Sequence, residues 1–263
     1  MSFSFNPPIR DWHNKVVWIV GASSGIGKAL AQELVRRQAI VIASARSLEN
    51  LQELSPAPRR TLALDISVPE MVRDAVRTLE QESLTPDVVF WVAGVYHPMG
   101  SDRLNLEQVR ETFNINTIAA YSGLAEVISL WDKTPNHPRH WSWISSVAGY
   151  RGLPQAAAYG ASKAALSYFA EVSYLELKQR QIAVSLVCPG FVATRLTQKN
   201  SFKMPAILTP HQAALETLSG LARGAFEIHY PKRFTLWLKF LGLLPDWLYF
   251  RIMRHALPSQ DQH

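Results

Sequence analysis

Cysteine is nearly absent from this sequence, in which Cys188 is the only one among 263 residues. A single thiol cannot form an intramolecular disulfide and cannot build a zinc site alone, so the cysteine framework of small secreted proteins is excluded. The histidines show no metal-ligand spacing either. We therefore predict no metal site, a cytoplasmic location, and a structural role for Cys188 in the core.

Long apolar runs are also missing. No stretch reaches the about 18 uncharged apolar residues that a membrane-spanning helix needs, and the opening MSFSFNPPIRDWHNK lacks an apolar core of signal-peptide length. Charge is only mildly unbalanced, because 27 basic and 21 acidic residues give a formal charge of +6. Without a basic run interleaved with aromatic residues, we expect no nucleic-acid partner.

The sequence instead alternates short β-branched runs with longer amphipathic segments. The predicted strands are 16–20, 40–45, 61–65, 88–93, 141–146, 183–188 and 226–230. The predicted helices are 25–37, 69–83, 106–131, 156–180 and 210–223. This order predicts an α/β fold, a single doubly wound Rossmann-like domain whose parallel sheet of about seven strands carries helices on both faces. Ligands of such sheets bind at the carboxyl ends of the strands.

A glycine-rich loop, GASSGIG, follows the first predicted strand and leads into an amphipathic helix. Glycines at such a turn let the backbone bend and let a pyrophosphate approach amides whose dipoles favour negative charge. A tight turn without a ligand is the alternative, but the strand before and the helix after it favour a dinucleotide loop. The predicted cofactor-binding residues of this loop are Gly21, Ser23, Ser24, Gly25, Ile26 and Gly27.

The end of the second predicted strand indicates which dinucleotide binds. An acidic residue there would accept from the ribose hydroxyl of NAD and repel the 2′-phosphate of NADP. The segment ASARS has no carboxylate, and Arg46 could pair with the phosphate, although it could also be a solvated surface residue. We therefore predict NADP(H) over NAD(H). Asp65, at the end of the third strand, could hold the adenine amino group or serve only as a helix cap.

The stretch YGASK carries the predicted chemistry. On a helix, Tyr159 and Lys163 stand four residues apart and share a face. An enzyme that interconverts an alcohol and a ketone needs an acid/base, and a nearby ammonium would lower the pKa of the phenol. Ser146, at the end of a strand, could bond the substrate oxygen, and its neighbour Ser145 is less favoured.

These motifs resemble the short-chain dehydrogenase/reductase family over roughly residues 14–230, through GASSGIG, ISS, YGASK and CPGFVAT. The resemblance implies a catalytic set of Ser146, Tyr159 and Lys163, with Asn116 holding a proton-relay water. It also implies that Lys163 bonds the nicotinamide ribose and that a homodimer or homotetramer forms. Beyond the glycine loop, Arg46 and Asp65, the implied cofactor-binding residues are Ala93, Gly94, Tyr159, Lys163, Pro189, Gly190, Val192 and Thr194.

Two positions depart from the family pattern. Val20 replaces the usual threonine before the first loop glycine, and WVAG, residues 91–94, replaces the usual NNAG. The missing asparagine normally braces the sheet near the cofactor, so we expect the local hydrogen bonding to be rearranged. The proton-transfer residues are unaffected, and we still expect catalysis.

The last part of the sequence changes character. We predict a Rossmann-like domain over 1–232, including the active site, and an apolar, basic helical extension over 233–263 that is not an independent domain. Residues 234–254 are dense in Trp, Leu and Phe, and Pro245 should split them into two short helices. Two interpretations stay open and can coexist: packing against this domain or a second subunit, and a cover over a lipophilic substrate site that contacts a membrane surface.

Two function classes follow from these features. The favoured one is an NADP-dependent oxidoreductase that interconverts a carbonyl and a secondary alcohol on a lipophilic substrate. The alternative is a catalytically silent dinucleotide-binding sensor or scaffold. The intact set of proton-transfer residues favours the enzyme.

Overall fold

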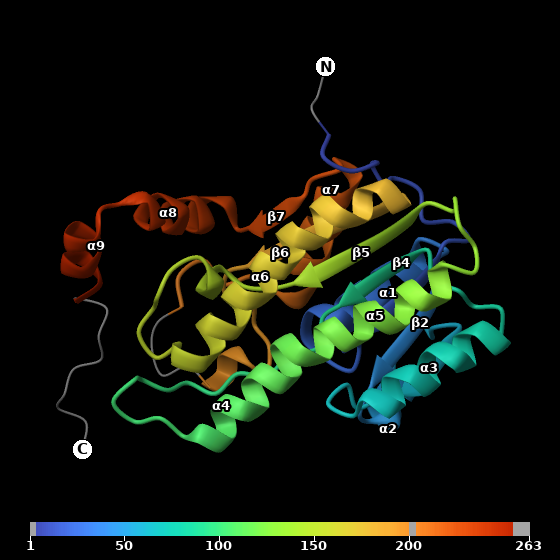
Figure 1. The fold of residues 1–263 in the computed structure, drawn as a ribbon, viewed down its shortest axis with the longest axis horizontal. Coiled ribbons are helices and arrows are strands. Elements are labelled where there is room, and N and C mark those ends of the chain that lie inside the picture. The colour runs from blue at the N-terminus through green and yellow to red at the C-terminus, as the bar shows by residue number, and fades with distance from the viewer. Residues whose placement is uncertain (1–3, 200–203, 255–263) are drawn as a thin grey trace.

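The strands of the protein form a parallel sheet in the order β3-β2-β1-β4-β5-β6-β7 (Figure 1). The computed structural model describes residues 4–199 and 204–254. Its strands are β1 (Val16–Val20), β2 (Ile40–Ala45), β3 (Arg60–Ala63), β4 (Val88–Trp91), β5 (Arg139–Ile144), β6 (Ile182–Pro189) and β7 (Glu227–Tyr230). The strand order reverses between β1 and β4, as in a doubly wound fold, so the predicted fold class is confirmed.

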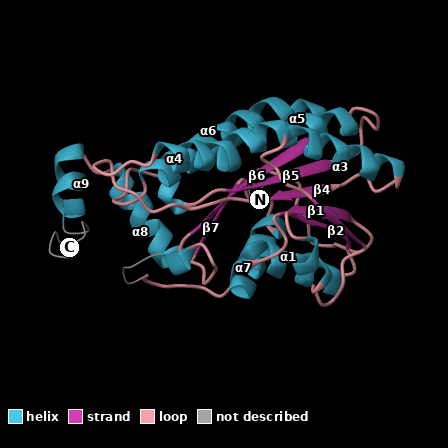
Figure 2. Ribbon diagram, turned by 90° about the horizontal axis from the view of Figure 1, so that it is seen from below, coloured by secondary structure: helices cyan, strands magenta, loops and turns pink. Residues whose placement is uncertain are grey.

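Helices cover both faces of this sheet (Figure 2). One face carries α1 (Gly25–Arg36) and α7 (Pro210–Ala222). The other face carries α3 (Pro69–Gln81), α5 (Ala119–Trp131) and α6 (Ala157–Leu177). Further described helices are α2 (Leu48–Gln52), α4 (Leu106–Phe113), α8 (Lys232–Leu243) and α9 (Asp246–Met253).

The helix predicted over 106–131 is interrupted. Between α4 and α5 the backbone forms a π-helical segment, Asn114–Ile118. Such segments add a residue to a helical turn and are frequent at functional sites. Here the π segment contains Asn116, whose buried side chain bonds the backbone of Val95.

Three predicted strands, those over 61–65, 88–93 and 141–146, end two residues earlier than expected, and α2 was not predicted at all. The strand predicted over 88–93 stops at Trp91 because the chain leaves the sheet there. The amides of Val92 and Ala93 both donate to the carbonyl of Val20, at 2.9 Å each. This turn places the following residues at the carboxyl edge of the sheet. The strand predicted over 61–65 ends at Ala63, where its pairing with β2 ends, and Asp65 lies beyond it.

The α5 face of the sheet holds a cluster of buried tryptophans. Trp91 stacks on Trp141 with ring centroids 5.7 Å apart, and Trp141 contacts Trp143 at 4.9 Å. A Cβ at Gly123 of α5 would lie 3.0 Å from Cζ2 of Trp91 and closer still to two other ring atoms. The helix can therefore approach the Trp91 indole only because residue 123 lacks a side chain.

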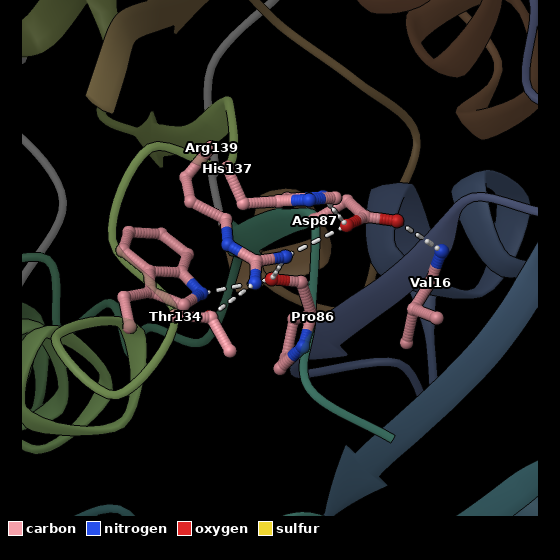
Figure 3. A network of polar contacts seen from close by, with 7 residues as sticks. Val16, Pro86, Asp87, Thr134, His137 and Arg139 are labelled. Carbon is pink, nitrogen blue, oxygen red and sulfur yellow. Dashed lines mark hydrogen bonds and ion pairs between the residues drawn. The ribbon is translucent and has the colours of Figure 1, made fainter. Parts of the chain in front are cut away.

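The opposite end of the sheet is tied together by Asp87, at the start of β4 (Figure 3). Its carboxylate accepts from the amide of Val16 at 2.9 Å, from Arg139 at 2.7 Å and interacts with His137 at 2.7 Å. The buried Arg139 also donates to the carbonyl of Pro86 at 3.1 Å. These contacts join β1, β4 and β5 at their amino ends, far from the edge where the cleft opens.

The last two described helices extend beyond the carboxyl end of β7 (Figure 1). The helix α8 begins at Lys232, and α9 follows at Asp246 after the predicted break at Pro245. Residues 255–263 of the predicted extension lie outside the described residues. Among residues 4–199 and 204–254, no helix combines the length and apolar character needed to cross a membrane.

Candidate functional site

A cleft of about 460 Å³ opens at the carboxyl edge of the sheet, where the strand order reverses. Most residues named in the sequence analysis line it: Gly21, Ser23, Ser24, Gly25, Ile26, Arg46, Asp65, Ala93, Gly94, Ser146, Tyr159, Lys163, Pro189, Gly190, Val192 and Thr194. Gly27 and Asn116 do not line this cleft and act from behind it. Segments far apart in sequence thus meet where an open α/β sheet binds its ligands.

The three glycines of the β1–α1 loop are required for different reasons. Gly21 has φ +98° and packs so tightly on the next strand that a Cβ would lie 2.6 Å from the amide nitrogen of Ala93. Gly25 has φ +54°, and its Cβ would lie 2.9 Å from Cγ2 of Thr194. A Cβ at Gly27 would overlap the carbonyl oxygen of Gly21. The first two keep the cleft open, and Gly27 lets α1 pack on the loop.

The amino end of α1 can receive an anion. Ser24 is the N-cap of α1, and its side chain makes no cap hydrogen bond in the described structure. The first turn also contains no acidic residue. The amides of this turn and the positive end of the helix dipole therefore suit a phosphate group. The loop accordingly fits the pyrophosphate of a dinucleotide.

The ends of β2 and β3 form the next wall of the cleft. Arg46 is exposed and follows β2 directly, and Ser47 caps α2 by accepting from the amide of Asn50 at 3.3 Å. Asp65 accepts from the hydroxyl of Ser67 at 2.6 Å. That bond lowers the pKa of Asp65, and the positive charge of Arg46 lowers it further. The pairing with Ser67 shows that Asp65 also organises the turn before α3.

The proposed catalytic side chains converge at the centre of the cleft. Ser146, just after β5, accepts from the amide of Ala148 at 3.1 Å, and its hydroxyl is near enough to Tyr159 to lower the pKa of that phenol. Lys163 is 3% exposed and donates to the carbonyl of Ile144 at 2.9 Å. Its Nζ lies 5.9 Å from the centre of the Tyr159 ring. The helical spacing of Tyr159 and Lys163 thus brings both to one place.

The pKa of Tyr159 differs from the sequence expectation. Burial raises it to about 12, and this effect outweighs the hydrogen bond from Ser146, which lowers it. Burial also lowers the pKa of Lys163 to about 8. We expected the ammonium to dominate the environment of the phenol. Instead Lys163 donates to a backbone carbonyl, and burial lowers its own pKa. Desolvation therefore sets the direction in which the pKa of Tyr159 shifts.

Ser145 and Ser146 have separate partners. The hydroxyl of Ser145 donates to the carbonyl of Lys163 at 2.9 Å and contacts Ser167 at 2.8 Å. These bonds turn it toward α6, whereas Ser146 is turned toward Tyr159. The geometry therefore favours Ser146 as the serine available to a substrate oxygen.

Asn116 holds the floor of the cleft from behind. Its Oδ1 accepts from the amide of Val95 at 2.8 Å, and its Nδ2 donates to the carbonyl of Val95 and to the hydroxyl of Ser162, both at 3.0 Å. Both amide hydrogens are therefore used, and a relay water could contact this side chain only at Oδ1. A Cβ at Gly94 would lie 3.0 Å from that oxygen and 3.4 Å from Nζ of Lys163.

The segment after β6 forms the last wall. Thr197 organises it, because its hydroxyl donates to the carbonyl of Val192 at 2.6 Å and accepts from the amide of Thr194 at 3.0 Å. Val192 and Thr194 are two of the residues that the family resemblance implies for cofactor binding. A ligand that formed hydrogen bonds with the carbonyl of Val192 or the amide of Thr194 would therefore compete with Thr197 for these groups. The loop continues into residues 200–203, which lie outside the described residues.

The sequence analysis missed three residues of this site. Tyr96 lies edge-on to Tyr159 with ring centroids 4.9 Å apart, and burial raises its pKa. Ser162 links Asn116 to the carbonyl of Tyr159, to which it donates at 2.8 Å. Thr197 is the third. Tyr96 could have been found as a polar ring shortly after a predicted strand, whereas the other two act through contacts that the sequence does not display.

Comparison with known proteins agrees with this geometry. The short chain dehydrogenase family model matches residues 15–204. A relative from Myxococcus xanthus, described as an uncharacterized oxidoreductase, is 33% identical over 88% of this chain and 93% of its own length. The chain therefore belongs to the short-chain dehydrogenase/reductase family, and it is an NAD(P)-dependent dehydrogenase/reductase that acts on CH–OH or C=O groups.

Two further proteins are similar over most of the chain. An 11-beta-hydroxysteroid dehydrogenase A from Sesamum indicum is 28% identical over 96% of this chain and 79% of its own length. The crystal structure of a short chain dehydrogenase from Burkholderia cenocepacia, in complex with NADP, aligns with a TM-score of 0.81 at 22% identity. That alignment covers 92% of this chain and 99% of the other, and it shows the shared fold.

Proposed function

We propose that the protein is an NADP-dependent oxidoreductase that interconverts a carbonyl and a secondary alcohol on a lipophilic substrate. The observation that carries this proposal is the meeting of Ser146, Tyr159 and Lys163 in the same cleft as the glycine loop. A proton donor and a nucleotide cradle within one cleft are what a reaction that moves a hydride and a proton requires.

In this proposal Tyr159 moves the proton. In the reducing direction, NADPH, when bound in the cleft, would supply a hydride to the carbonyl carbon. Tyr159 donates its hydroxyl proton to the carbonyl oxygen, and its pKa of about 12 keeps it protonated and ready to donate near neutral pH. Ser146 bonds the same oxygen as negative charge develops on it. The ammonium of Lys163, whose pKa of about 8 keeps most of it charged at neutral pH, would stabilise the phenolate that remains.

The preference for NADP rests on the end of β2. Arg46 borders the cleft there, and the buried strand residues before it, Ser44 and Ala45, carry no negative charge. A 2′-phosphate at this place would meet a guanidinium instead of a carboxylate. The NADP in the Burkholderia cenocepacia enzyme is consistent with this proposal.

The lipophilic substrate is supported by the tail and by one relative. The steroid dehydrogenase from Sesamum indicum acts, by its name, on an apolar alcohol or ketone. In this chain, the tail helices α8 and α9 lie beyond the carboxyl end of β7 (Figure 1), and they carry large apolar side chains that are exposed. Both observations favour an apolar substrate over a charged one.

We further propose how the chain is organised and with what it assembles. The domain extends over 1–232 and the helical extension over 233–263, and the protein acts in the cytoplasm, where it also contacts a membrane through residues 234–254. A homodimer or homotetramer would form through α5 and α6. Tyr168 and Leu175 of α6 are each 71% exposed, and burial of these apolar side chains against a second copy would favour that assembly.

The decisive test is Tyr159→Phe. It should lower turnover of a carbonyl substrate with NADPH at least about 100-fold, the scale of general acid catalysis, and should leave NADPH affinity nearly unchanged. Tyr168→Phe, on the same helix but exposed, is the matched control and should keep full turnover. Turnover in the Tyr159 variant equal to that of the wild type would refute the assignment. NADPH binding without reduction of any carbonyl in a broad panel would instead favour a dinucleotide sensor.

A further inference from the structure

The outer side of the tail carries large apolar side chains that nothing in the described structure covers. Leu243 is 84% exposed and Trp247 is 69% exposed. The full set is spread over both tail helices and consists of Leu236, Trp237, Phe240, Leu243, Trp247, Phe250 and Ile252. We call this set the outer tail face. In α8 its members recur at helical spacing and form one stripe.

The other side of α8 is already occupied. Phe234 and Leu238 pack against the buried core, and Leu241 is 4% exposed. Phe234 also contacts Phe191, with ring centroids 5.4 Å apart, next to the cleft. The helix is thus apolar on two sides, of which one completes the domain. The outer tail face remains unexplained by folding alone.

Basic residues accompany the outer tail face. Arg233, at the start of α8, and Arg251 and Arg254, at the end of α9, are all exposed. Asp246 is the only acidic residue from 232 to 254, and Arg151 already pairs with it at 2.6 Å. The tail therefore presents exposed positive charge together with exposed Trp, Phe and Leu. This combination is typical of helices that lie in the interface of an anionic membrane.

The tail is fixed to the loop that follows the proposed catalytic serine. The guanidinium of Arg151 lies 3.9 Å from the centre of the Tyr249 ring and is only 20% exposed. It donates to the three carbonyls that end α8, at 3.3, 3.1 and 2.7 Å, those of Leu241, Gly242 and Leu244. One side chain therefore holds the end of α8, the start of α9 and the stacked aromatic ring together.

The residues on either side of Arg151 hold the tail as well. Tyr150 donates to Glu227 at 2.6 Å, and Glu227 forms an ion pair with Lys239 of α8. Tyr249 of α9 donates to the carbonyl of Gly152 at 2.6 Å. Residues 150–152 follow Ser146 by only a few positions. A displacement of the tail would therefore reach the loop beside the catalytic serine directly.

We propose that the outer tail face docks on anionic lipid membranes and that Arg151 fixes it rigidly to the 147–152 loop, so that docking holds the mouth of the cleft toward the lipid. Arg151 is then a positioning residue for substrates dissolved in the membrane. The membrane contact and the positioning of substrates deepen the proposed function and rest on it, whereas the coupling of the tail to the loop through Arg151 rests on contacts within the chain.

A second copy of the chain is the competing occupant of the outer tail face. In a two-fold symmetric pairing through this face, the same arginines of both copies would approach one another without acidic partners on the face. Such a pairing would bury like charges in an apolar contact. Anionic lipid instead matches both the apolar and the basic side chains.

Co-sedimentation of the full-length protein with vesicles tests docking. The wild type should bind vesicles that contain phosphatidylserine, bind neutral phosphatidylcholine vesicles less, and be released partly by salt. Leu243→Glu and Trp247→Glu should each weaken vesicle binding at least about tenfold, because each replaces an apolar side chain with a carboxylate that the anionic lipid repels. Leu106→Glu, at an exposed leucine of α4, is the matched control and should bind like the wild type.

Two results would overturn docking. One is failure of the wild type to bind phosphatidylserine vesicles at low salt. The other is a change of oligomeric state in the tail variants with no vesicle binding by the wild type, which would assign the face to a second copy. Neither result depends on enzymatic activity.

Hydrogen exchange tests the coupling through Arg151. In the wild type, addition of phosphatidylserine vesicles should slow amide exchange in the tail and also in residues 147–152. In Arg151→Ala, vesicles should still protect the tail but should no longer protect the loop, and Arg151→Lys, which keeps a cationic donor, should recover part of the effect. Equal protection of the loop in Arg151→Ala and the wild type would refute the coupling.

Enzyme kinetics then test the positioning role. Arg151→Ala should raise the KM for a long-chain methyl ketone dissolved in the vesicles and leave the KM for a short, water-soluble methyl ketone within about twofold. An equal rise for both ketones would show a general structural defect and reject the positioning role. Absence of turnover with both ketones in the wild type would reject the proposed function while leaving membrane docking to be judged by the vesicle and exchange experiments.

Discussion

Replacement of Gly123 should show how closely α5 depends on the tryptophan cluster beneath it. In an ordinary exposed helix, Gly→Ala stabilises by up to about 1 kcal/mol, because alanine is the better helix former. In α5 the new Cβ would lie 3.0 Å from Cζ2 of Trp91 and nearer still to Cη2 and Cζ3. Carbon atoms prefer separations of about 3.5–4.0 Å, so the indole would have to move.

The indole has little room to move. It is 1% exposed and stacks on Trp141, which is itself packed against Trp143 and Trp131. Overpacking of such a core costs about 1–3 kcal/mol. With the helix-propensity gain set against the upper part of this range, we expect Gly123→Ala to lower the free energy of unfolding by about 2 kcal/mol.

Urea denaturation monitored by far-ultraviolet circular dichroism measures this change. Gly242→Ala is the matched control, because Gly242 is also helical, in α8, and a Cβ there would meet nothing within 4 Å. The control should be as stable as the wild type or slightly more stable. The double variant Gly123→Ala with Trp91→Leu should be more stable than the sum of the two single changes predicts, since the smaller side chain removes the overlap. A Gly123→Ala protein as stable as the wild type would refute the reasoning.

Two further predictions concern the cofactor and the pH dependence of stability. Arg46→Ala should reduce the preference for NADPH over NADH by about 1–3 kcal/mol in titrations with both cofactors, and Ala45→Asp should reverse it; equal affinity of the wild type for both would contradict the proposal. Burial lowers the pKa of His140 to about 4. The unfolded chain therefore binds a proton at higher pH than the folded chain does, and stability should fall as the pH drops from about 6.5 to about 4. His140→Gln should remove about 2–3 kcal/mol of that loss in denaturation curves at several pH values, and an identical profile for the variant and the wild type would rule out His140 as its source.

Local motifs explain why much of the fold and the candidate site could be predicted. The glycine loop is set by the backbone of a few consecutive residues, and Gly21 and Gly25 indeed adopt positive φ. Tyr159 and Lys163 needed only a helix, and α6 provides it. The alternation of apolar runs and amphipathic segments likewise indicated the order of strands and helices.

The missed features depend on contacts between distant segments. Arg151 forms hydrogen bonds with the carbonyls of α8 and with the side chain of Asp246, which lie 90 to 95 residues further along the sequence. Neither segment has a sequence pattern that would predict this contact. The π segment around Asn116 is of the same kind, because the apolar pattern from 106 to 131 fits a continuous helix. The pKa of Tyr159 also could not be read from its neighbours in sequence, since burial by the whole cleft decides it.

The replacement of the family's NNAG by WVAG is visible in the sequence, but its effect depends on contacts between distant segments. The sequence revealed the loss of a bracing asparagine but not its consequence. In the structure the Trp91 ring turns away from the cleft and packs toward α5, with Gly123 making room for it. The bracing comes instead from the amides of Val92 and Ala93, which both bond the carbonyl of Val20, and from Asn116, which holds both the amide and the carbonyl of Val95. The tryptophan therefore enlarges the core on one side of β4, while the cleft at the carboxyl end of β4 keeps its shape. For this reason we expect this protein, with WVAG in place of NNAG, to remain competent for catalysis.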